Sequence, residues 1–251
     1  MDNNVRSKVI YLIFPPGAND ARFVHQLKPL LESISHRIIS ISYPSRFKSS
    51  RIHGFDSIDT IAEYVYKFLK KLLINSDHLD IRIMAFSFGT AVVTRLFQNH
   101  SEIQTRFPHS NYKLLLVNAG EFFGEKATYI FKSLFEPALN NKKYLRILRY
   151  FVTTFFKFLP RKLYPNSRLL DLNEQWLSTV GYRINMKYKI DIPATVILGT
   201  RDLVITPESK EKIKNIFTDS ELLFYPGDHI YDYHRLIIYD EALDIMNSWV
   251  A

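Results

Sequence analysis

Apolar and polar positions along the chain follow two periods, one typical of strands and one of helices. The two kinds of stretch alternate from residue 8 to about residue 120 and again from residue 193. The predicted strands are 8–14, 37–43, 80–86, 112–118, 194–199 and 221–225. The predicted helices are 20–34, 56–74, 88–99, 207–217 and about 233–249. Strands joined through helices pair in parallel, so we expect an α/β fold with a mostly parallel, doubly wound sheet.

A long stretch without strand character interrupts this alternation. Residues 121–187 have helical patterning and follow the predicted strand at 112–118. The sequence contains no internal repeat, low-complexity segment or Gly/Ser-rich linker that would mark a second domain. We therefore expect a single domain over residues 1–251, with a core formed by 1–120 and 188–251 and a helical cap at about 121–187.

A serine stands where the predicted strand 80–86 turns into a helix. Ser87 has Ala85 two positions before it and Gly89 two positions after it. Small residues at these two places let a strand and a helix approach each other around a strained serine, as in a nucleophile elbow. Glycine is usual at both places, so Ala85 departs from the pattern. A serine in an ordinary strand-to-helix turn would also fit this segment, and the assignment needs further residues.

Two more turns that carry polar residues follow predicted strands later in the chain. Strand 194–199 is followed by Thr200-Arg201-Asp202-Leu203-Val204, and strand 221–225 is followed by Pro226-Gly227-Asp228-His229. Serine, acid and histidine thus occur in the chain order of the α/β-hydrolase fold. A serine hydroxyl needs a neighbouring imidazole to accept its proton, and a carboxylate orients that imidazole.

Together these motifs resemble the α/β-hydrolase superfamily of serine hydrolases, in its single-domain form with a helical lid. The turns Phe-Pro-Pro-Gly at 14–17 and Gly-Asp-His at 227–229 are similar to those of esterase and thioesterase members. The resemblance implies a triad in which Ser87 attacks, His229 moves the proton and Asp202 orients the histidine.

The resemblance also implies an oxyanion hole, formed by the backbone N–H groups of Ala18 and Phe88. Pro16 stands where histidine is usual in the first loop of the family. Proline has no N–H, but the expected donor lies two residues later, so this departure need not abolish the site.

Three other polar residues follow predicted strands, and one of them is an alternative for a role in the site. Glu121 follows the strand after which some hydrolases of this fold place their acid, so it is a second candidate for the triad carboxylate. Asp228 precedes the histidine, where a local role in the turn is expected. His234 lies too far along the chain to share the turn of His229, and we interpret it as a surface or helix-start residue.

The expected function is cleavage of a carboxylic ester or acyl thioester of an apolar acyl group through an acyl-enzyme. Two alternatives stay open: an acyltransferase that uses the same triad, and an inactive hydrolase-fold protein that binds a ligand or partner. The substrate, its chain length and the oligomeric state are not predicted.

Composition agrees with one α/β domain and limits the chemistry. The chain has 251 residues, of which 47% are hydrophobic, and no cysteine. The lack of cysteine excludes disulfides and thiolate nucleophiles and is typical of a reducing compartment. The polar first eight residues contain no signal-peptide core, and no apolar run is long enough to span a membrane. We therefore expect a cytoplasmic location. The histidines show no metal-ligand spacing, so we expect no metal, and no other cofactor is expected.

The positive charge of the chain is concentrated in the predicted cap. The formal net charge is +8, and residues 137–170 contain eight Lys and Arg side chains but no Asp or Glu. Many aromatic and aliphatic residues lie between these charges. The cap could present a solvated basic face over a packed interior. It could alternatively contact an anionic membrane or a carrier-bound acyl group with a negative head group. Nucleic-acid binding is not expected, because no recognised module is present.

Overall fold

The computed structural model describes most of the predicted core and little of the predicted cap. The described residues are 8–16, 21–31, 37–43, 57–74, 79–103, 111–122, 181–202, 204–229, 231–232 and 237–250. Among the sequence predictions, Ala18, His234 and the basic stretch 137–170 lie outside these ranges. The division into core and cap therefore stays a prediction.

A six-stranded sheet forms the centre of the molecule, with strand order β2-β1-β3-β4-β5-β6. All neighbouring strands in this sheet pair in parallel. The strands are β1 (Lys8–Phe14), β2 (Arg37–Ser40), β3 (Leu79–Phe86), β4 (Asn111–Val117), β5 (Ala194–Gly199) and β6 (Ser220–Tyr225). Because all strands run the same way, their carboxyl ends meet at one edge, where ligand sites of open α/β sheets form.

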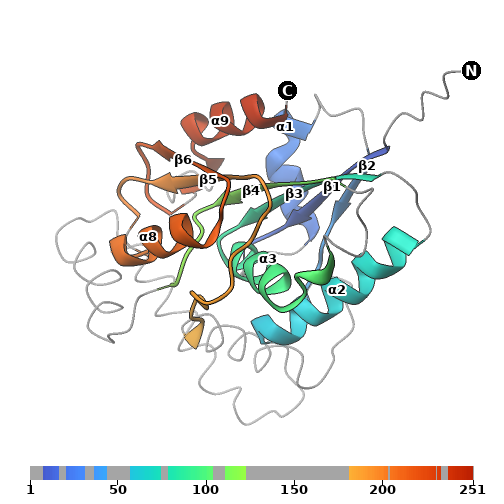
Figure 1. Ribbon diagram of the computed structural model, residues 1–251. Helices are drawn as coiled ribbons and strands as arrows, with labels where there is room; N and C mark the ends of the chain where they lie inside the picture. The colour runs from blue at the N-terminus through green and yellow to red at the C-terminus, as the bar shows by residue number, and fades with distance from the viewer. Residues whose placement is uncertain are drawn as a thin grey trace, which may run out of the picture.

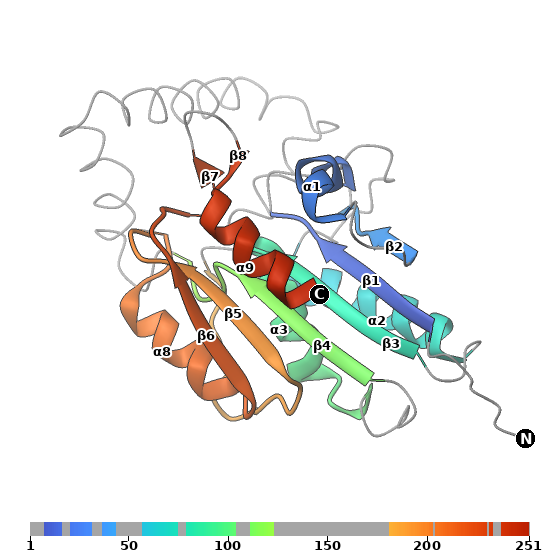
Figure 2. The same ribbon diagram turned by 90° about the horizontal axis from the view of Figure 1, so that it is seen from above.

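Helices cover both faces of this sheet (Figures 1 and 2). One face carries α2 (Ile58–Ile74), α3 (Phe88–Asn99) and α8 (Pro207–Ile216). The other carries the 3-10 helix η1 (Ala21–Leu27), which continues into α1 (Lys28–Leu31), and the last helix α9 (Asp240–Val250). This arrangement confirms the doubly wound α/β sheet expected from the sequence.

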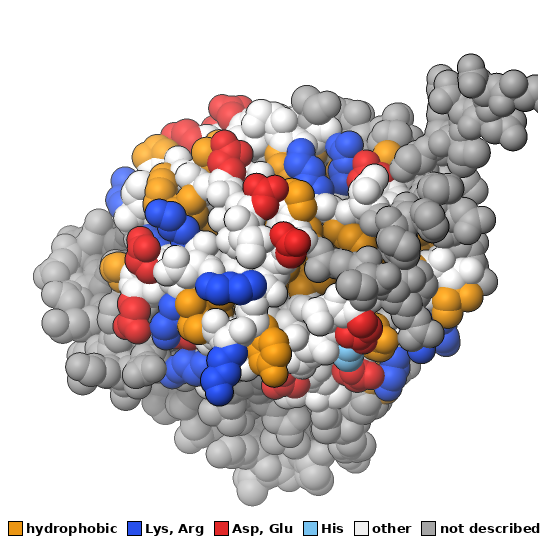
Figure 3. Space-filling model, in the orientation of Figure 1, with side chains coloured by type: hydrophobic (Ala, Val, Ile, Leu, Met, Phe, Trp, Pro, Cys, Tyr) orange, Lys and Arg blue, Asp and Glu red, His pale blue; other side chains and the backbone are white. Residues whose placement is uncertain are grey.

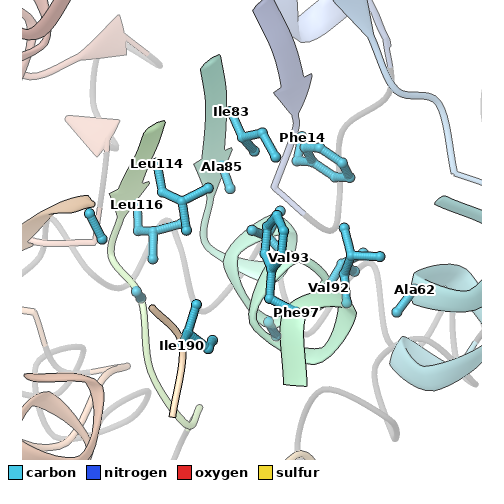
Figure 4. Packing of buried hydrophobic residues seen from close by; sticks show 14 of the residues in the cluster. Phe14, Ala62, Ile83, Ala85, Val92, Val93, Phe97, Leu114, Leu116 and Ile190 are labelled. Atoms are coloured by element: carbon cyan, nitrogen blue, oxygen red, sulfur yellow. The ribbon is translucent and has the colours of Figure 1, made fainter. Parts of the chain in front are cut away.

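Alternation of side chains along each strand creates two hydrophobic layers. In β1, Ile10, Leu12 and Phe14 belong to the core under α2, α3 and α8. Tyr11 and Ile13 belong to the core under α1 and α9. Figure 4 shows the first layer, in which side chains of β1, β3 and β4 face the apolar side of α3. Burial on both faces explains why these strands read as nearly continuous apolar runs.

Two helix predictions were wrong in part. The stretch predicted as one helix at 20–34 is a 3-10 helix followed by a single α-helical turn. Pro29 cannot donate a backbone hydrogen bond inside a continuous helix, whereas it is tolerated in the first turn of α1. The closing helix begins only at Asp240, and a two-stranded antiparallel pair, β7 (Tyr231–Asp232) and β8 (Ile237–Ile238), precedes it.

Residue types account for this later helix start. Ile237 and Ile238 are β-branched and favour extended backbone, while acidic residues in the first turn of a helix stabilise its N-terminus. Asp240 and Glu241 supply that acidic first turn. The helical spacing of the apolar residues alone did not distinguish the β7–β8 pair from the helix α9.

The surface of the described residues carries both signs of charge. On the face seen in Figure 3, acidic and basic side chains are interspersed. None of the helices in the described ranges has the length and hydropathy required to cross a bilayer.

Candidate active site

Ser87 occupies a strained turn between β3 and α3. Its backbone has φ 49° and ψ −117°, a left-handed conformation that is rare for residues other than glycine. A serine at the first boundary of a helix usually caps it with the side chain, but the Ser87 hydroxyl makes no such bond. Its carbonyl oxygen instead accepts hydrogen bonds from the N–H and hydroxyl of Thr90, at 2.8 and 2.6 Å. The Ser87 hydroxyl is therefore free to face another group.

Close contact between α3 and β1 explains the small residue two positions after the serine. A Cβ atom added to Gly89 would lie 2.6 Å from the carbonyl oxygen of Phe14. Ala85, two positions before the serine, is fully buried and pairs with Phe14 and Leu116 across the sheet. Its methyl group is thus accommodated in β3, whereas any side chain at Gly89 would force the elbow away from β1.

His229 lies between Ser87 and Asp202. Its Nε2 is 2.7 Å from the Ser87 hydroxyl oxygen, and its Nδ1 is 2.8 Å from Oδ2 of Asp202. The side chains of His229 and Asp202 are 11% and 0% exposed, respectively. The ring of Phe122 packs edge-on against the imidazole, with centroids 6.4 Å apart. The three residues come from turns after β3, β5 and β6, at the same edge of the sheet.

All acceptor positions of the Asp202 carboxylate are used. Oδ1 accepts the backbone N–H groups of Val204 and Ile205 at 2.8 and 3.2 Å, and Oδ2 accepts the side-chain amide of Asn118 as well as His229. Burial alone would raise the pKa of Asp202, but the charge of His229 and the hydrogen bonds from His229, Val204 and Ile205 outweigh it and lower the pKa below its ordinary value.

The tautomer of His229 follows from this environment. An ionised carboxylate can only accept hydrogen bonds, so Nδ1 of His229 carries a proton and donates a hydrogen bond to Asp202. In the neutral imidazole Nε2 is then an acceptor, and the Ser87 hydroxyl donates to it. This arrangement allows the imidazole to take the serine proton.

Direct contacts between the acid turn and the histidine turn bring their side chains together. Backbone N–H groups of Thr200 and Arg201 donate to the carbonyl oxygens of Tyr225 and Gly227, at 3.0 and 2.9 Å. A Cβ atom added to Gly199 would lie 2.3 Å from the carbonyl oxygen of the residue that precedes His229. The absence of a side chain at Gly199 thus permits the short distance between the two turns.

Glu121, the second candidate acid, has other partners. It is 3% exposed, and its carboxylate accepts the backbone N–H of Ile184 at 2.8 Å and the ammonium of Lys212 at 3.0 Å. The hydrogen bond to Glu121 is the main cause of a raised pKa of Lys212. These contacts attach the segment that begins at Gly181 to α8, rather than orienting His229.

Asp228, the residue before the histidine, also has local partners. Its carboxylate lies 3.5 Å from Nε of Arg201, and it accepts the hydroxyl of Tyr239 at 3.2 Å. The expected local role in the turn agrees with these contacts.

The backbone N–H of Phe88 lies at the start of α3, directly after Ser87. The first N–H groups of a helix have no acceptor within it, and the helix dipole favours negative charge there. Phe88 is buried and packs edge-on against Tyr43, with ring centroids 5.1 Å apart. The Tyr43 hydroxyl donates to the carbonyl oxygen of Pro15 at 2.8 Å, where the first loop begins. Ala18, the other expected donor, lies outside the described residues.

Sequence reasoning did not assign a role to Asn118 or to Tyr225. Asn118 has φ 54° and is fully buried beside Asp202, and the Tyr225 hydroxyl lies 3.0 Å from its side-chain oxygen. An asparagine directly after a buried strand is a weak signal, because this residue type adopts left-handed backbone more readily than most. Nothing in the sequence indicates that its amide meets the carboxylate of Asp202.

Comparison with known proteins gives a family and a fold. The model of the family described as "Serine hydrolase (FSH1)" matches residues 45–231, which include Ser87, Asp202 and His229. A search of curated proteins finds no match.

Several solved structures are similar over almost the whole chain. An esterase from Exiguobacterium antarcticum is 17% identical with a TM-score of 0.66, and covers 97% of this chain and 92% of its own. The type II thioesterase BorB from the borrelidin biosynthetic cluster is 16% identical with a TM-score of 0.65, at 98% and 92% coverage. The RedJ thioesterase of the prodiginine pathway in Streptomyces coelicolor is 14% identical with a TM-score of 0.63, at 99% and 87% coverage. These similarities confirm a fold of the α/β-hydrolase type.

Proposed function

Because the chain belongs to the FSH1 family of serine hydrolases, we propose that Ser87, His229 and Asp202 are the catalytic triad with which it hydrolyses esters or thioesters. The observation that carries this assignment is the position of His229, within 2.7 Å of the Ser87 hydroxyl and 2.8 Å of Asp202. The strained backbone of Ser87 supports it, since strain at such a turn is typical of nucleophile elbows.

In this mechanism His229 accepts the proton of Ser87 at Nε2 while the serine oxygen attacks the carbonyl carbon of the substrate. The tetrahedral oxyanion is stabilised by the N–H of Phe88 and, by resemblance, that of Ala18. The protonated His229 then gives its proton to the leaving oxygen or sulfur, and the acyl group stays on Ser87. Water, deprotonated by His229, attacks the acyl-enzyme, and His229 returns that proton to the Ser87 oxygen as the acid is released. Asp202 stabilises the imidazolium in both halves of the reaction.

The proposed substrate is a small molecule with an apolar acyl group in ester or thioester linkage. Similar structures described as an esterase and as thioesterases support both linkages equally. In this proposal the eight basic residues between 137 and 170 bind an anionic membrane surface or the negative head group of a carrier-bound acyl group. The cysteine-free composition supports a cytoplasmic location.

A substrate series tests the proposal. Hydrolysis of nitrophenyl esters and of acyl thioesters with increasing chain length is measured for the parent and for Ser87→Ala. We expect the parent to prefer a defined chain length. We expect Ser87→Ala to reduce kcat/KM on the order of 10⁴-fold or more on every substrate, because the nucleophile is lost.

The folded state of Ser87→Ala is checked by circular dichroism and thermal unfolding. Full turnover by the folded variant would exclude Ser87 as the nucleophile. Turnover of neither esters nor thioesters by the parent would exclude the proposed substrate class.

A further inference from the structure

A second polar side chain, Asn118, contacts the carboxylate of Asp202. Asn118 follows β4 directly, and its backbone N–H extends the sheet by donating to the carbonyl oxygen of Ile197 at 2.7 Å. Its φ of 54° turns the side chain out of the strand path, and its Nδ2 donates to Oδ2 of Asp202. That oxygen is also the one that faces Nδ1 of His229.

The Asp202 carboxylate fixes which end of the Asn118 amide meets it, because an ionised carboxylate only accepts hydrogen bonds. The Tyr225 hydroxyl lies 3.0 Å from Oδ1 of Asn118 and 2.7 Å from the carbonyl oxygen of Asp228. A flipped amide would point its oxygen at the Asp202 carboxylate, so two acceptors would face each other. The carboxylate thus selects the amide orientation with Nδ2 toward Asp202, and the Tyr225 hydroxyl, whose one proton the two oxygens share, lies against Oδ1.

We propose that Asn118 is a positioning residue of the triad, which holds Oδ2 of Asp202 in line with His229 and moderates its charge, and that the Tyr225 hydroxyl supports the Asn118 amide from its oxygen side. The inference rests on the proposed triad and adds a residue that does not touch the substrate. Because Tyr225 also contacts the carbonyl of Asp228, one hydroxyl connects β6, the end of β4 and the histidine turn.

The effect on His229 is electrostatic as well as geometric. A donor on Oδ2 withdraws charge from the atom that stabilises the imidazolium, so without it the imidazole should hold its proton more tightly. Other charged groups near these turns have partners of their own. Asp228 pairs with Arg201 and Tyr239, and Glu121 pairs with Lys212, so a substitution at Asn118 removes none of these partners.

Asn118→Gly is the first test, since glycine tolerates the positive φ while the side chain and its amide are removed. We expect kcat to fall about 10- to 100-fold with little change in KM, because a small displacement of the triad affects the transition state more than substrate binding. We also expect the acidic limb of the kcat/KM profile to move to higher pH by about half a unit.

Asn118→Asp is the second test and keeps size and backbone preference. It places two carboxylates at hydrogen-bond distance, and such a pair shares one proton and titrates as a unit. We therefore expect the pH profile of this variant to contain an ionisation that the parent lacks. A merely structural role of Asn118 would lower stability without adding such a step.

Gln98→Met provides the matched control for loss of a buried amide. Gln98 is 4% exposed on α3, and its amide donates to the carbonyl oxygens of Asn185 and Tyr188, at 2.7 and 3.4 Å. This control should lower the melting temperature and leave the pH profile unchanged.

Tyr225→Phe should shift the acidic limb of the kcat/KM profile in the same direction as Asn118→Gly, by less. Tyr112→Phe, which changes a buried tyrosine of β4, should not shift it.

The activities of the parent and of Ser87→Ala separate a failure of the proposed triad from a failure of the positioning role of Asn118. If the parent turns over substrate and Ser87→Ala does not, the triad stands, and the Asn118 variants test the inference alone. A folded Asn118→Gly with parental kcat and pH profile, or an Asn118→Asp profile that superimposes on the parental one, would overturn the positioning role. If Ser87→Ala were as active as the parent, the triad itself would fail.

Discussion

Opposite environments suit Ser87 and Asp202 to different tasks. Ser87 is partly exposed, and its hydroxyl has His229 as its described partner. The Asp202 side chain is fully buried and held by two backbone N–H groups and two side chains. A carboxylate fixed from four sides cannot reorient during a reaction cycle, so the geometry of His229 relative to Ser87 depends largely on it.

The first residue-scale prediction concerns which carboxylate serves the histidine. Asp202→Asn should reduce kcat on the order of 10⁴-fold, because an amide in its place favours the wrong imidazole tautomer. Glu121→Gln should keep kcat within a few-fold of the parent and lower the free energy of unfolding by about 1–2 kcal/mol through its weakened bond to Lys212. Steady-state kinetics and denaturant unfolding of both variants check this, and the reverse pattern would move the acid to Glu121.

The lowered pKa of Asp202 predicts how the stability of the parent and of Asp202→Asn should differ with pH. A carboxyl with a depressed folded-state pKa contributes stability above its unfolded pKa and loses it as the pH falls through the folded-state value. Since the ordinary pKa is 3.8, the stability that depends on Asp202 should be present at neutral pH and disappear below that value. As the pH falls below 3.8, the melting temperature of the parent should therefore decrease more steeply than that of Asp202→Asn.

Sequence motifs identified the residues that meet at the site but not those that hold them. Ser87 and His229 lie within hydrogen-bond distance, because both follow parallel strands whose carboxyl ends share an edge. Asn118 could not be assigned in this way. Its role depends on which residues β5 and β6 place beside it, and that pairing is a property of the tertiary structure.

At the scale of elements, the β5 and β6 turns act as one unit through Gly199. Gly199→Ala should push its methyl group into the carbonyls of Gly227 and Asp228, 2.6 and 2.3 Å away. We expect a loss of about 1–3 kcal/mol of unfolding free energy and a fall in kcat of up to about 100-fold, because the histidine turn must move. Thermal unfolding and kinetics measure the two effects.

Gly181→Ala is the control for this prediction, since nothing lies within 4 Å of a Cβ atom at that position. It should match the parent in both measurements. Parental stability and activity in Gly199→Ala as well would show that the two turns do not depend on their close contact.

Periodicity predicted elements well where burial dominates and poorly where backbone chemistry decides. The strands at 8–14 and 194–199 have the predicted ends, since apolar runs between polar residues define them. The pair β7 and β8 was missed because its two-residue strands are too short to show a period. The helix predicted across Pro29 failed because proline withdraws a backbone donor from the helix.

At the scale of the whole molecule, the last described residues of the predicted cap are bound tightly to the core. Arg95 pairs with Asp59 at 2.9 Å and also donates to the carbonyl oxygen of Arg183, while its guanidinium lies over the ring of Tyr182. Burial raises the pKa of that tyrosine. Together with the contacts of Gln98 and Glu121, these bonds fix where residues 181–188 rejoin the sheet.

Labelling with a fluorophosphonate probe tests the central claim most directly, because only an activated serine reacts rapidly with it. We predict fast, stoichiometric labelling of the parent, with the adduct mapped by mass spectrometry to the peptide that contains Ser87. Ser87→Ala should not label, and His229→Ala should label far more slowly while remaining folded. An adduct on a different serine, or equal labelling of the parent and Ser87→Ala, would contradict the account.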